Sequence, residues 1–179
     1  MTVRITTATQ VWPDDAEELW PVYDAVFADQ PDAATWRAEV WDRHVARAGF
    51  RLARAYDGGA LVGFAYGYTG EAGQWWTDHA REVLPAHVAD AWLGGHFEVV
   101  TLGVLPAARR AGTGRALMAS LLDALPHERL LLMTTSDPVD PARRLYAATG
   151  WQVLGPGLGE ATVILGRRAA RAPVDARGS

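Results

Sequence analysis

Residues 104–115 (VLPAARRAGTGR) contain the residue types that bind an anion, and they join an apolar segment to an amphipathic one. Gly112 and Gly114 lack side chains that would keep a phosphate away from the backbone. Unpaired amide hydrogens at a helix start point outward, and the helix dipole adds partial positive charge there. Three arginines add full charges: Arg109, Arg110 and Arg115. The pattern predicts a pyrophosphate site, although two glycines are also consistent with a tight turn alone.

The residue types that are missing exclude other chemistries. The chain has no cysteine, so it can form no disulfide, thiolate nucleophile or thiolate metal site. All 17 basic residues are arginine, which excludes a phosphate-loop lysine and a Schiff-base lysine. His79, His87 and His96 match no metal-ligand spacing, so we expect no metal and place them at the surface or the acceptor site. The serines lack the nucleophile-elbow motif of hydrolases.

A second motif follows at residues 142–151 (ARRLYAATGW), where a predicted helix leads into a strand. Together with residues 109–114 (RRAGTG), it resembles the GNAT superfamily of acetyltransferases, whose patterns read R/Q-x-x-G-x-G/A and A-x-x-L-Y-x-x-x-G-F. The likeness in the order of elements extends over about residues 3–167, and its specific part is residues 96–155. One position departs from the family: Val139 stands where many members have an asparagine.

The resemblance implies an α/β (α+β) fold with a GNAT-like mixed, mostly antiparallel central sheet of about seven strands flanked by helices. It also implies an N-acetyltransferase that moves an acetyl group from acetyl-CoA, as cosubstrate, to a primary amine by direct attack in a ternary complex. Main-chain groups of one strand end would hold the pantetheine arm: Leu102, Gly103 and Val104. Backbone amides of the following loop would hold the pyrophosphate: Arg109, Arg110, Ala111, Gly112, Thr113, Gly114 and Arg115.

Two residues are candidates for proton transfer. Tyr146 stands where the family places a tyrosine that protonates the departing thiolate, and an ordinary phenol pKa of ~10 keeps it protonated. Glu98 precedes Val104 by six residues in an apolar strand, as a catalytic glutamate does in some branches. Strand alternation puts Glu98 on a face with apolar residues, which would raise its pKa and make it a better general base. The alternatives are that Tyr146 only packs its ring and that Glu98 pairs with a structural arginine.

The elements that position these residues follow from hydrophobic periodicity and turn residues. Asp57-Gly58-Gly59 predicts a hairpin, and residues 69–95 read as an insertion with one or two short helices. Within it, Trp75 and Trp76 should not both be buried, and one of them is expected to line the acceptor pocket. We predict strands at 3–8, 50–56, 60–68, 96–104, 129–135, 151–154 and 160–167. We predict helices from Pro13, from about Asp32 to Gly49, over 111–125 and from Asp140 to Gly150.

Length and charge complete the prediction. The 179 residues, 49% hydrophobic, predict one domain over residues 1–167 and a disordered basic tail over 168–179. Neither a membrane span nor a signal peptide is apparent, so we expect a cytoplasmic protein with no membrane partner. Residues 1–42 carry nine acidic groups against two arginines, a net charge of -7. This charge predicts a cationic acceptor, a small-molecule or peptide amine, with tryptophan offering a cation–π face.

Two rival functions remain at this level. A non-catalytic acyl-CoA-binding or regulatory module would keep the loop without the chemistry. A nucleotide-binding oxidoreductase would use residues 112–117 as a dinucleotide turn, but Leu117 stands where glycine or alanine is needed. The total charge of -4 disfavours nucleic acid as a partner. The sequence leaves the oligomeric state open, a homodimer included.

Overall fold

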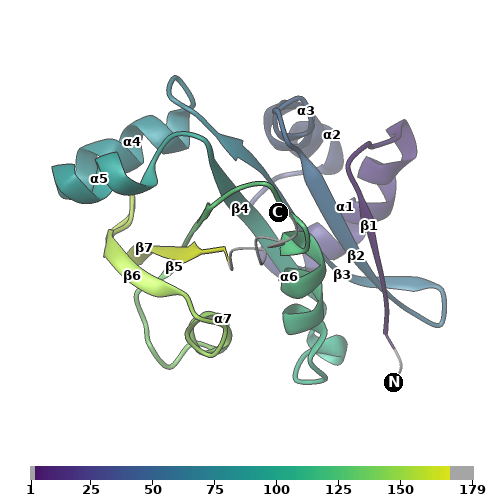
Figure 1. Ribbon diagram of the computed structural model, residues 1–179. Helices are drawn as coiled ribbons and strands as arrows, with labels where there is room; N and C mark the ends of the chain where they lie inside the picture. Colours follow the sequence, from purple (N-terminus) through teal and green to yellow (C-terminus); the bar gives the residue numbers. More distant parts are fainter. Residues whose placement is uncertain (1–2, 170–179) are drawn as a thin grey trace, which may run out of the picture. The chain divides into compact units, whose positions relative to one another are not determined.

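The computed structural model describes residues 3–169, and Figure 1 labels its helices and strands. The strands are β1 (Arg4–Ala8), β2 (Arg51–Asp57), β3 (Ala60–Gly70), β4 (His96–Val104), β5 (Arg129–Thr135), β6 (Gln152–Pro156) and β7 (Thr162–Arg168). The helices are α1 (Pro13–Phe27), α2 (Ala33–Trp36), α3 (Asp42–Val45), α4 (Trp75–Val83), α5 (Ala86–Trp92), α6 (Thr113–Leu122) and α7 (Pro141–Ala147). A π-helical turn covers Arg37–Trp41 and a 3-10 turn covers Pro106–Ala108.

The seven strands form one sheet in the order β1-β2-β3-β4-β5-β7-β6. The pairs β1–β2, β2–β3, β5–β7 and β6–β7 are antiparallel. This confirms the predicted seven-stranded, mostly antiparallel sheet. Over residues 3–169, no helix is both long enough and apolar enough to cross a membrane.

The described residues form two compact units, each made of two stretches of chain. The first unit contains residues 3–69 and 98–125, and the second contains residues 70–97 and 126–169. The expectation of one domain over residues 1–167 stays a prediction. The predicted tail lies outside the described residues from position 170 onward.

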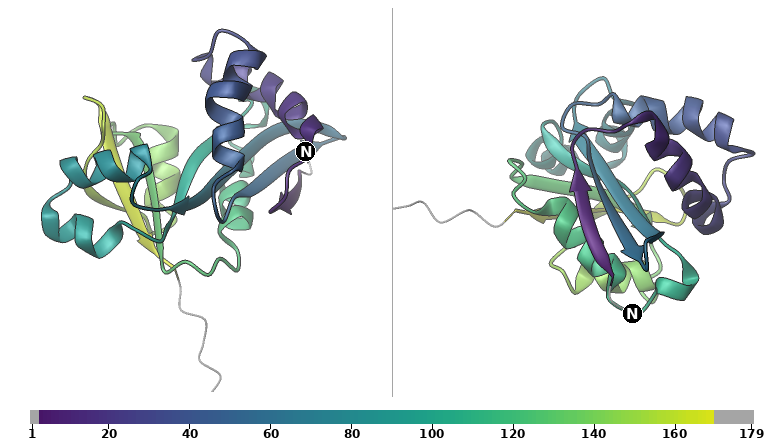
Figure 2. Two further views of the ribbon diagram at one scale, coloured as in Figure 1. Left: turned by 90° about the horizontal axis from the view of Figure 1, so that it is seen from above. Right: turned by 90° about the vertical axis from the view of Figure 1, so that its right-hand side faces the viewer.

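In the first unit, helices cover both faces of the strands β1–β3 (Figure 2). Side chains of α1, such as Leu19 and Val22, pack in one core cluster with Leu52 and Phe64 of the strands. On the other face, a Cβ at Gly63 would lie 3.3 Å from Leu117 of α6, so β3 and α6 approach closely there. Adjacent residues of β3 therefore face α6 and α1 in turn, as strand alternation requires.

The segment after α1 contains the helix predicted from about Asp32 to Gly49, as a continuous helical stretch over residues 33–45. Asp32 caps α2 as expected, because its side chain accepts a hydrogen bond of 2.8 Å from the amide of Thr35. The regular helix then widens into the π-helical turn, in which the amide of Asp42 bonds to the carbonyl of Arg37 five residues earlier. The predicted helix is therefore confirmed, but it contains a π-helical turn and its last helical residue is Val45, four positions before Gly49.

The second unit buries the apolar sides of α4 and α5 against its own strands. Trp76, Ala80 and Trp92 form a core cluster with Leu131 of β5 and Ile164 of β7. This cluster explains why residues 69–95, which the sequence presents as an insertion, are ordered as two short helices.

Candidate active site

The loop before α6 has the backbone conformation that an anion site needs. Gly112 is the N-cap residue of α6 with φ +82°, and a Cβ placed there would meet nothing within 4 Å. Glycine is therefore needed at this position for its backbone angle and not for space. Arg110 also has a positive φ of 62°, which is uncommon for a residue with a side chain. Two left-handed residues two positions apart turn the chain sharply into the helix.

The start of α6 leaves amide hydrogens free for a ligand. The first bond of the helix joins the amide of Ala116 to the carbonyl of Gly112 at 3.0 Å. The amides of Thr113, Gly114 and Arg115 consequently have no partner inside the helix. The Thr113 side chain is turned away, because its buried hydroxyl donates to the Ala108 carbonyl at 2.9 Å and fastens the loop. This arrangement fits the pyrophosphate of coenzyme A, which would lie against these amides.

The three arginines of the loop differ in their contacts. The Nε of Arg109 donates to the carbonyl oxygen of Val104 at 2.9 Å, so this side chain ties the loop to the end of β4. Arg110 and Arg115 are exposed, and none of the ion pairs found in residues 3–169 involves them. These two arginines are the ones free to contribute charge to a bound phosphate.

The end of β4 presents the residues expected to hold the pantetheine arm. The amide of Leu105 donates to the Val62 carbonyl of β3 at 2.9 Å, which fixes the strand end. The carbonyl of Val104 is already taken by Arg109. The assignment of the pantetheine arm to the main chain of Leu102, Gly103 and Val104 stays a prediction.

Glu98 is a buried carboxylate, only 4% exposed. Burial raises its pKa to about 8, and the nearby positive charge of Arg47 acts in the opposite direction. Its Oε2 has no hydrogen-bond partner within the described residues, and no arginine forms an ion pair with it there. The raised pKa expected from the apolar strand is confirmed. A carboxylate with this pKa and a free oxygen is suited to accept a proton from an ammonium once the pH reaches about 8.

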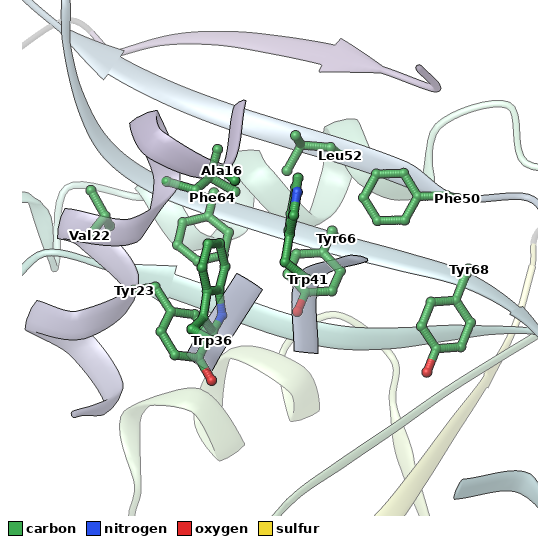
Figure 3. Packing of buried hydrophobic residues seen from close by; sticks show 11 residues of the cluster. Ala16, Val22, Tyr23, Trp36, Trp41, Phe50, Leu52, Phe64, Tyr66 and Tyr68 are labelled. Atoms are coloured by element: carbon green, nitrogen blue, oxygen red, sulfur yellow. The ribbon is translucent and has the colours of Figure 1, made fainter. Parts of the chain in front are cut away.

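A group of aromatic and polar side chains that the sequence did not single out lies in the same unit. Tyr23, Tyr66 and Tyr68 all point their hydroxyl groups to one side of the core cluster (Figure 3). The negative charge of Glu98 contributes to raising the pKa of both Tyr66 and Tyr68, after burial itself. The pKa of Tyr23 is also raised, first by burial and then by Asp29, to which its hydroxyl donates at 3.2 Å. The tyrosines therefore stay neutral donors beside the carboxylate.

His44 of α3 completes this group. Its Nδ1 lies 3.1 Å from the Tyr66 hydroxyl, and its ring packs on Tyr66 and Tyr68 at centroid distances of 5.7 and 5.4 Å. Burial, followed by repulsion from Arg47 and Arg43, lowers the pKa of His44 to about 4, so the ring is neutral at pH 7. Histidine and tyrosine are 22 positions apart, and no local spacing in the sequence could have indicated their pairing.

The expected regular alternation of β4 is interrupted. Val100 packs against the core cluster, and the next residue, Thr101, hydrogen bonds through its side chain with Tyr66 of the same cluster. A regular strand would send two neighbours to opposite faces. Gly103 also faces this side, because a Cβ there would meet Phe27 and Phe64. The expectation that Glu98, Val100, Leu102 and Val104 form one regular face is therefore wrong beyond Val100.

Tyr146 lies in α7, in the second unit. It is buried, and burial followed by the charge of Asp140 raises its pKa to about 12. Its ring meets that of Trp151 edge-on at 6.0 Å. Asp140 is the helix cap, accepting from the amides of Ala142 at 2.7 Å and Arg143 at 3.4 Å. The ring thus packs, as the alternative held, while the hydroxyl remains protonated and able to donate; its catalytic role stays a prediction.

The second unit contains His96 and the tryptophan pair Trp75 and Trp76. His96 is fully buried, and its Nδ1 accepts from the Gly94 amide at 3.2 Å. Its expected place at the surface is corrected: it fills the space beside Gly70, where a Cβ would come 2.2 Å from its ring, and the acceptor-site alternative stays a prediction. Trp75 is 64% exposed and Trp76 is buried, which confirms that they are not both buried. No cluster of potential metal ligands occurs within residues 3–169.

Much of the acidic charge of the first 42 residues is already paired. Asp15 and Glu18 both pair with the nearly buried guanidinium of Arg54. Glu39 pairs with Arg43 and Asp42 with Arg37. These four carboxylates serve local structure, so the charge available to an acceptor is smaller than the composition suggests.

Comparisons with known proteins find similarity to acetyltransferases. Residues 12–151 match the family described as "Acetyltransferase (GNAT) family". A GCN5-like protein acetyltransferase of Mycobacterium tuberculosis is 31% identical over 146 residues, which cover 65% of this chain and 71% of that protein. A mycothiol acetyltransferase of Frankia casuarinae is 36% identical over 159 residues, which cover 82% of this chain and 41% of that longer protein.

A solved structure extends the comparison to the fold. The PaiA N-acetyltransferase of Thermoplasma acidophilum, crystallised in complex with coenzyme A, has a TM-score of 0.60 and 13% sequence identity to this chain. The match covers 94% of this chain and all of that one. At this identity the likeness concerns the fold.

Proposed function

The chain belongs to the GNAT family of acetyltransferases, and we propose that it transfers an acetyl group from acetyl-CoA to the nitrogen of a primary amine. One observation carries the proposal. The strand that bears the buried, unpaired carboxylate of Glu98 leads directly into a loop with free amides at the start of α6. A proton acceptor and a pyrophosphate site on one continuous segment are what transfer from a bound thioester requires.

In the proposed reaction, Glu98 takes a proton from the substrate ammonium, directly or through a water molecule. The free amine then attacks the thioester carbonyl carbon, forming the C–N bond, and the C–S bond breaks as the tetrahedral intermediate collapses. The sulfur leaves with the bonding electron pair and receives a proton, and the nitrogen, positively charged after the attack, releases its second proton to water, so that a neutral amide forms. We assign the protonation of the sulfur to Tyr146, whose place in the family motif and protonated hydroxyl support it.

The acceptor is proposed to be a small-molecule or peptide amine that binds as a cation. The tyrosines of the core cluster and the carboxylate of Asp29 support this choice, because neutral aromatic rings and an anionic oxygen stabilise an ammonium group. We further propose that nucleic acid and membranes are not partners, on the negative total charge.

The test is a coupled measurement on one protein preparation. Calorimetry measures the affinity for coenzyme A and acetyl-CoA, and thiol detection measures release of coenzyme A with polyamines, amino acids, aminoglycosides and N-terminal peptides. We expect binding and turnover with at least one cationic amine. Binding without turnover on any amine would instead identify a non-catalytic acyl-CoA-binding module. A preference for anionic acceptors would contradict the proposed acceptor class.

A further inference from the structure

Gly103 has no side chain for a reason of space. Its φ lies outside the left-handed region, so its backbone conformation is open to any residue. A Cβ at this position would lie 3.2 Å from Cε2 and 3.5 Å from Cζ of Phe27, and 3.6 Å from Cε1 of Phe64. The outer edge of the Phe27 ring therefore rests on the β4 backbone at Gly103, within the stretch expected to hold the pantetheine arm.

Phe27 is held in place from its own helix. Its ring packs on Tyr23 at a centroid distance of 4.9 Å, and α1 ends immediately after it at Ala28, which has a φ of 48°. The amide of Ala28 bonds to the Asp24 carbonyl at 3.0 Å, and Asp29 accepts from the Tyr23 hydroxyl. The backbone beside Phe27 is thus held by these bonds, and the ring contact with Tyr23 helps to keep the Phe27 ring against β4.

Phe27 as a whole residue is nevertheless 37% exposed, a large fraction for a phenylalanine that touches a strand of the sheet. On the proposed function, the thioester lies along β4 between the base Glu98 and the pantetheine-binding residues that end at Val104. The Phe27 edge at Gly103 adjoins this stretch. An acyl chain longer than acetyl would need the volume that the ring fills.

We infer that Phe27 is a specificity-determining residue that restricts the acyl group to short chains, acting as a wall beside the thioester at Gly103. This inference rests on the proposed function. It names a property that the family likeness alone does not give, namely the length of the transferred group.

The experiment compares acetyl-CoA, butyryl-CoA and hexanoyl-CoA on the wild type and on Phe27→Ala. Dissociation constants come from calorimetry and kcat/KM from thiol release with one accepted amine. We expect the wild type to prefer acetyl-CoA, and Phe27→Ala to shift the hexanoyl-to-acetyl ratio at least about tenfold toward hexanoyl. Affinity for coenzyme A itself should change less than about threefold. Phe27→Leu, a milder replacement that keeps an apolar contact, should give an intermediate ratio.

Two further variants separate the wall from general effects. Trp12→Ala removes another exposed aromatic residue of the first unit, 70% exposed, and should leave the acyl ratio unchanged. Gly103→Ala adds the methyl group that presses on Phe27, so it should weaken acyl-CoA binding, and Phe27→Ala in the same chain should restore part of the loss.

Each outcome is decisive. Equal changes for all three thioesters in Phe27→Ala, or a wild type that already prefers hexanoyl-CoA, would overturn the inference. Thioester binding without turnover would remove the proposed function, yet the dissociation constants would still show whether Phe27 selects chain length. A wild type with no affinity for coenzyme A would overturn both.

Discussion

At the scale of single residues, Glu98 shows how the surroundings change a side chain's chemistry. An ordinary glutamate is ionised at neutral pH and is a weak base. Burial raises the pKa of Glu98 to about 8, and its Oε2 keeps no partner within the described residues. The same carboxylate would be of little use for catalysis if Arg47 were close enough to form an ion pair with it.

The raised pKa predicts a pH profile. Below about pH 8 the folded protein holds Glu98 protonated, so the base is absent, and activity should rise as the pH increases through this value. Glu98→Gln should lower kcat about 100-fold and remove this rising limb. Initial rates of the wild type and of Glu98→Gln, measured from pH 6 to 9.5, test the rising limb and its loss in the variant. An unchanged pH profile in Glu98→Gln would show that another group sets the limb.

Tyr146 permits a test that separates packing from catalysis. Phenylalanine preserves the ring contact with Trp151 and removes only the hydroxyl. Tyr146→Phe should therefore lower kcat about 10- to 100-fold while the dissociation constant of acetyl-CoA stays within about twofold. Steady-state kinetics and calorimetry measure the two quantities. If kcat is unchanged, the tyrosine serves only the core of its unit.

At the scale of elements, the start of α6 depends on one backbone angle. Gly112→Ala should cost about 1 kcal/mol of stability, because φ is +82° there, and should weaken coenzyme A binding at least about tenfold by moving the free amides. Gly58→Ala is the matched control: Gly58 has φ +57°, with equally open space around its Cβ, but lies in the β2–β3 turn.

Gly58→Ala should lose similar stability and no affinity. Urea denaturation gives the stabilities, and calorimetry gives the affinities. Equal losses of affinity in both variants would mean that the α6 amides do not hold the ligand.

The elements also show what the sequence could predict. The strands 96–104 and 129–135 were predicted with their observed bounds, because long apolar runs between turn residues leave little ambiguity. The helix predicted at 111–125 is shorter, Thr113–Leu122, since Gly112 caps it and Ala124 already has a φ of 51°. Helix and strand ends depend on such local angles, which the apolar pattern does not encode.

The candidate site was predictable where it is contiguous. The glycine spacing and the positive charge of residues 109–115 indicate a phosphate site in the sequence itself. The position of Glu98 in an apolar strand likewise indicates a buried carboxylate. His44, Tyr66 and Phe27 could not be found in this way. They come from three separate elements, and only the folded chain brings them beside β4 residues such as Thr101 and Gly103.

At the scale of the whole molecule, the charge distribution gives a prediction about salt. Four of the nine carboxylates in residues 1–42 pair with arginines, so long-range attraction of a cationic amine should be modest. We expect kcat/KM for such an amine to fall less than about threefold between 10 and 150 mM salt. Initial rates at several ionic strengths measure this. A tenfold fall in kcat/KM would instead show that the net charge of residues 1–42 attracts the amine over a long range.

The π-helical turn described above has a consequence for changes in chain length. Its hydrogen bonds join residues five apart, and this brings the indoles of Trp36 and Trp41 into a stack at 5.5 Å, both on the buried side. Deleting the exposed Glu39 would put the two indoles four positions apart, the spacing at which an ordinary α-helix stacks them. We therefore expect the segment to keep its fold when one residue between the two indoles is deleted. An additional residue between them would instead rotate one indole away from the core and into water.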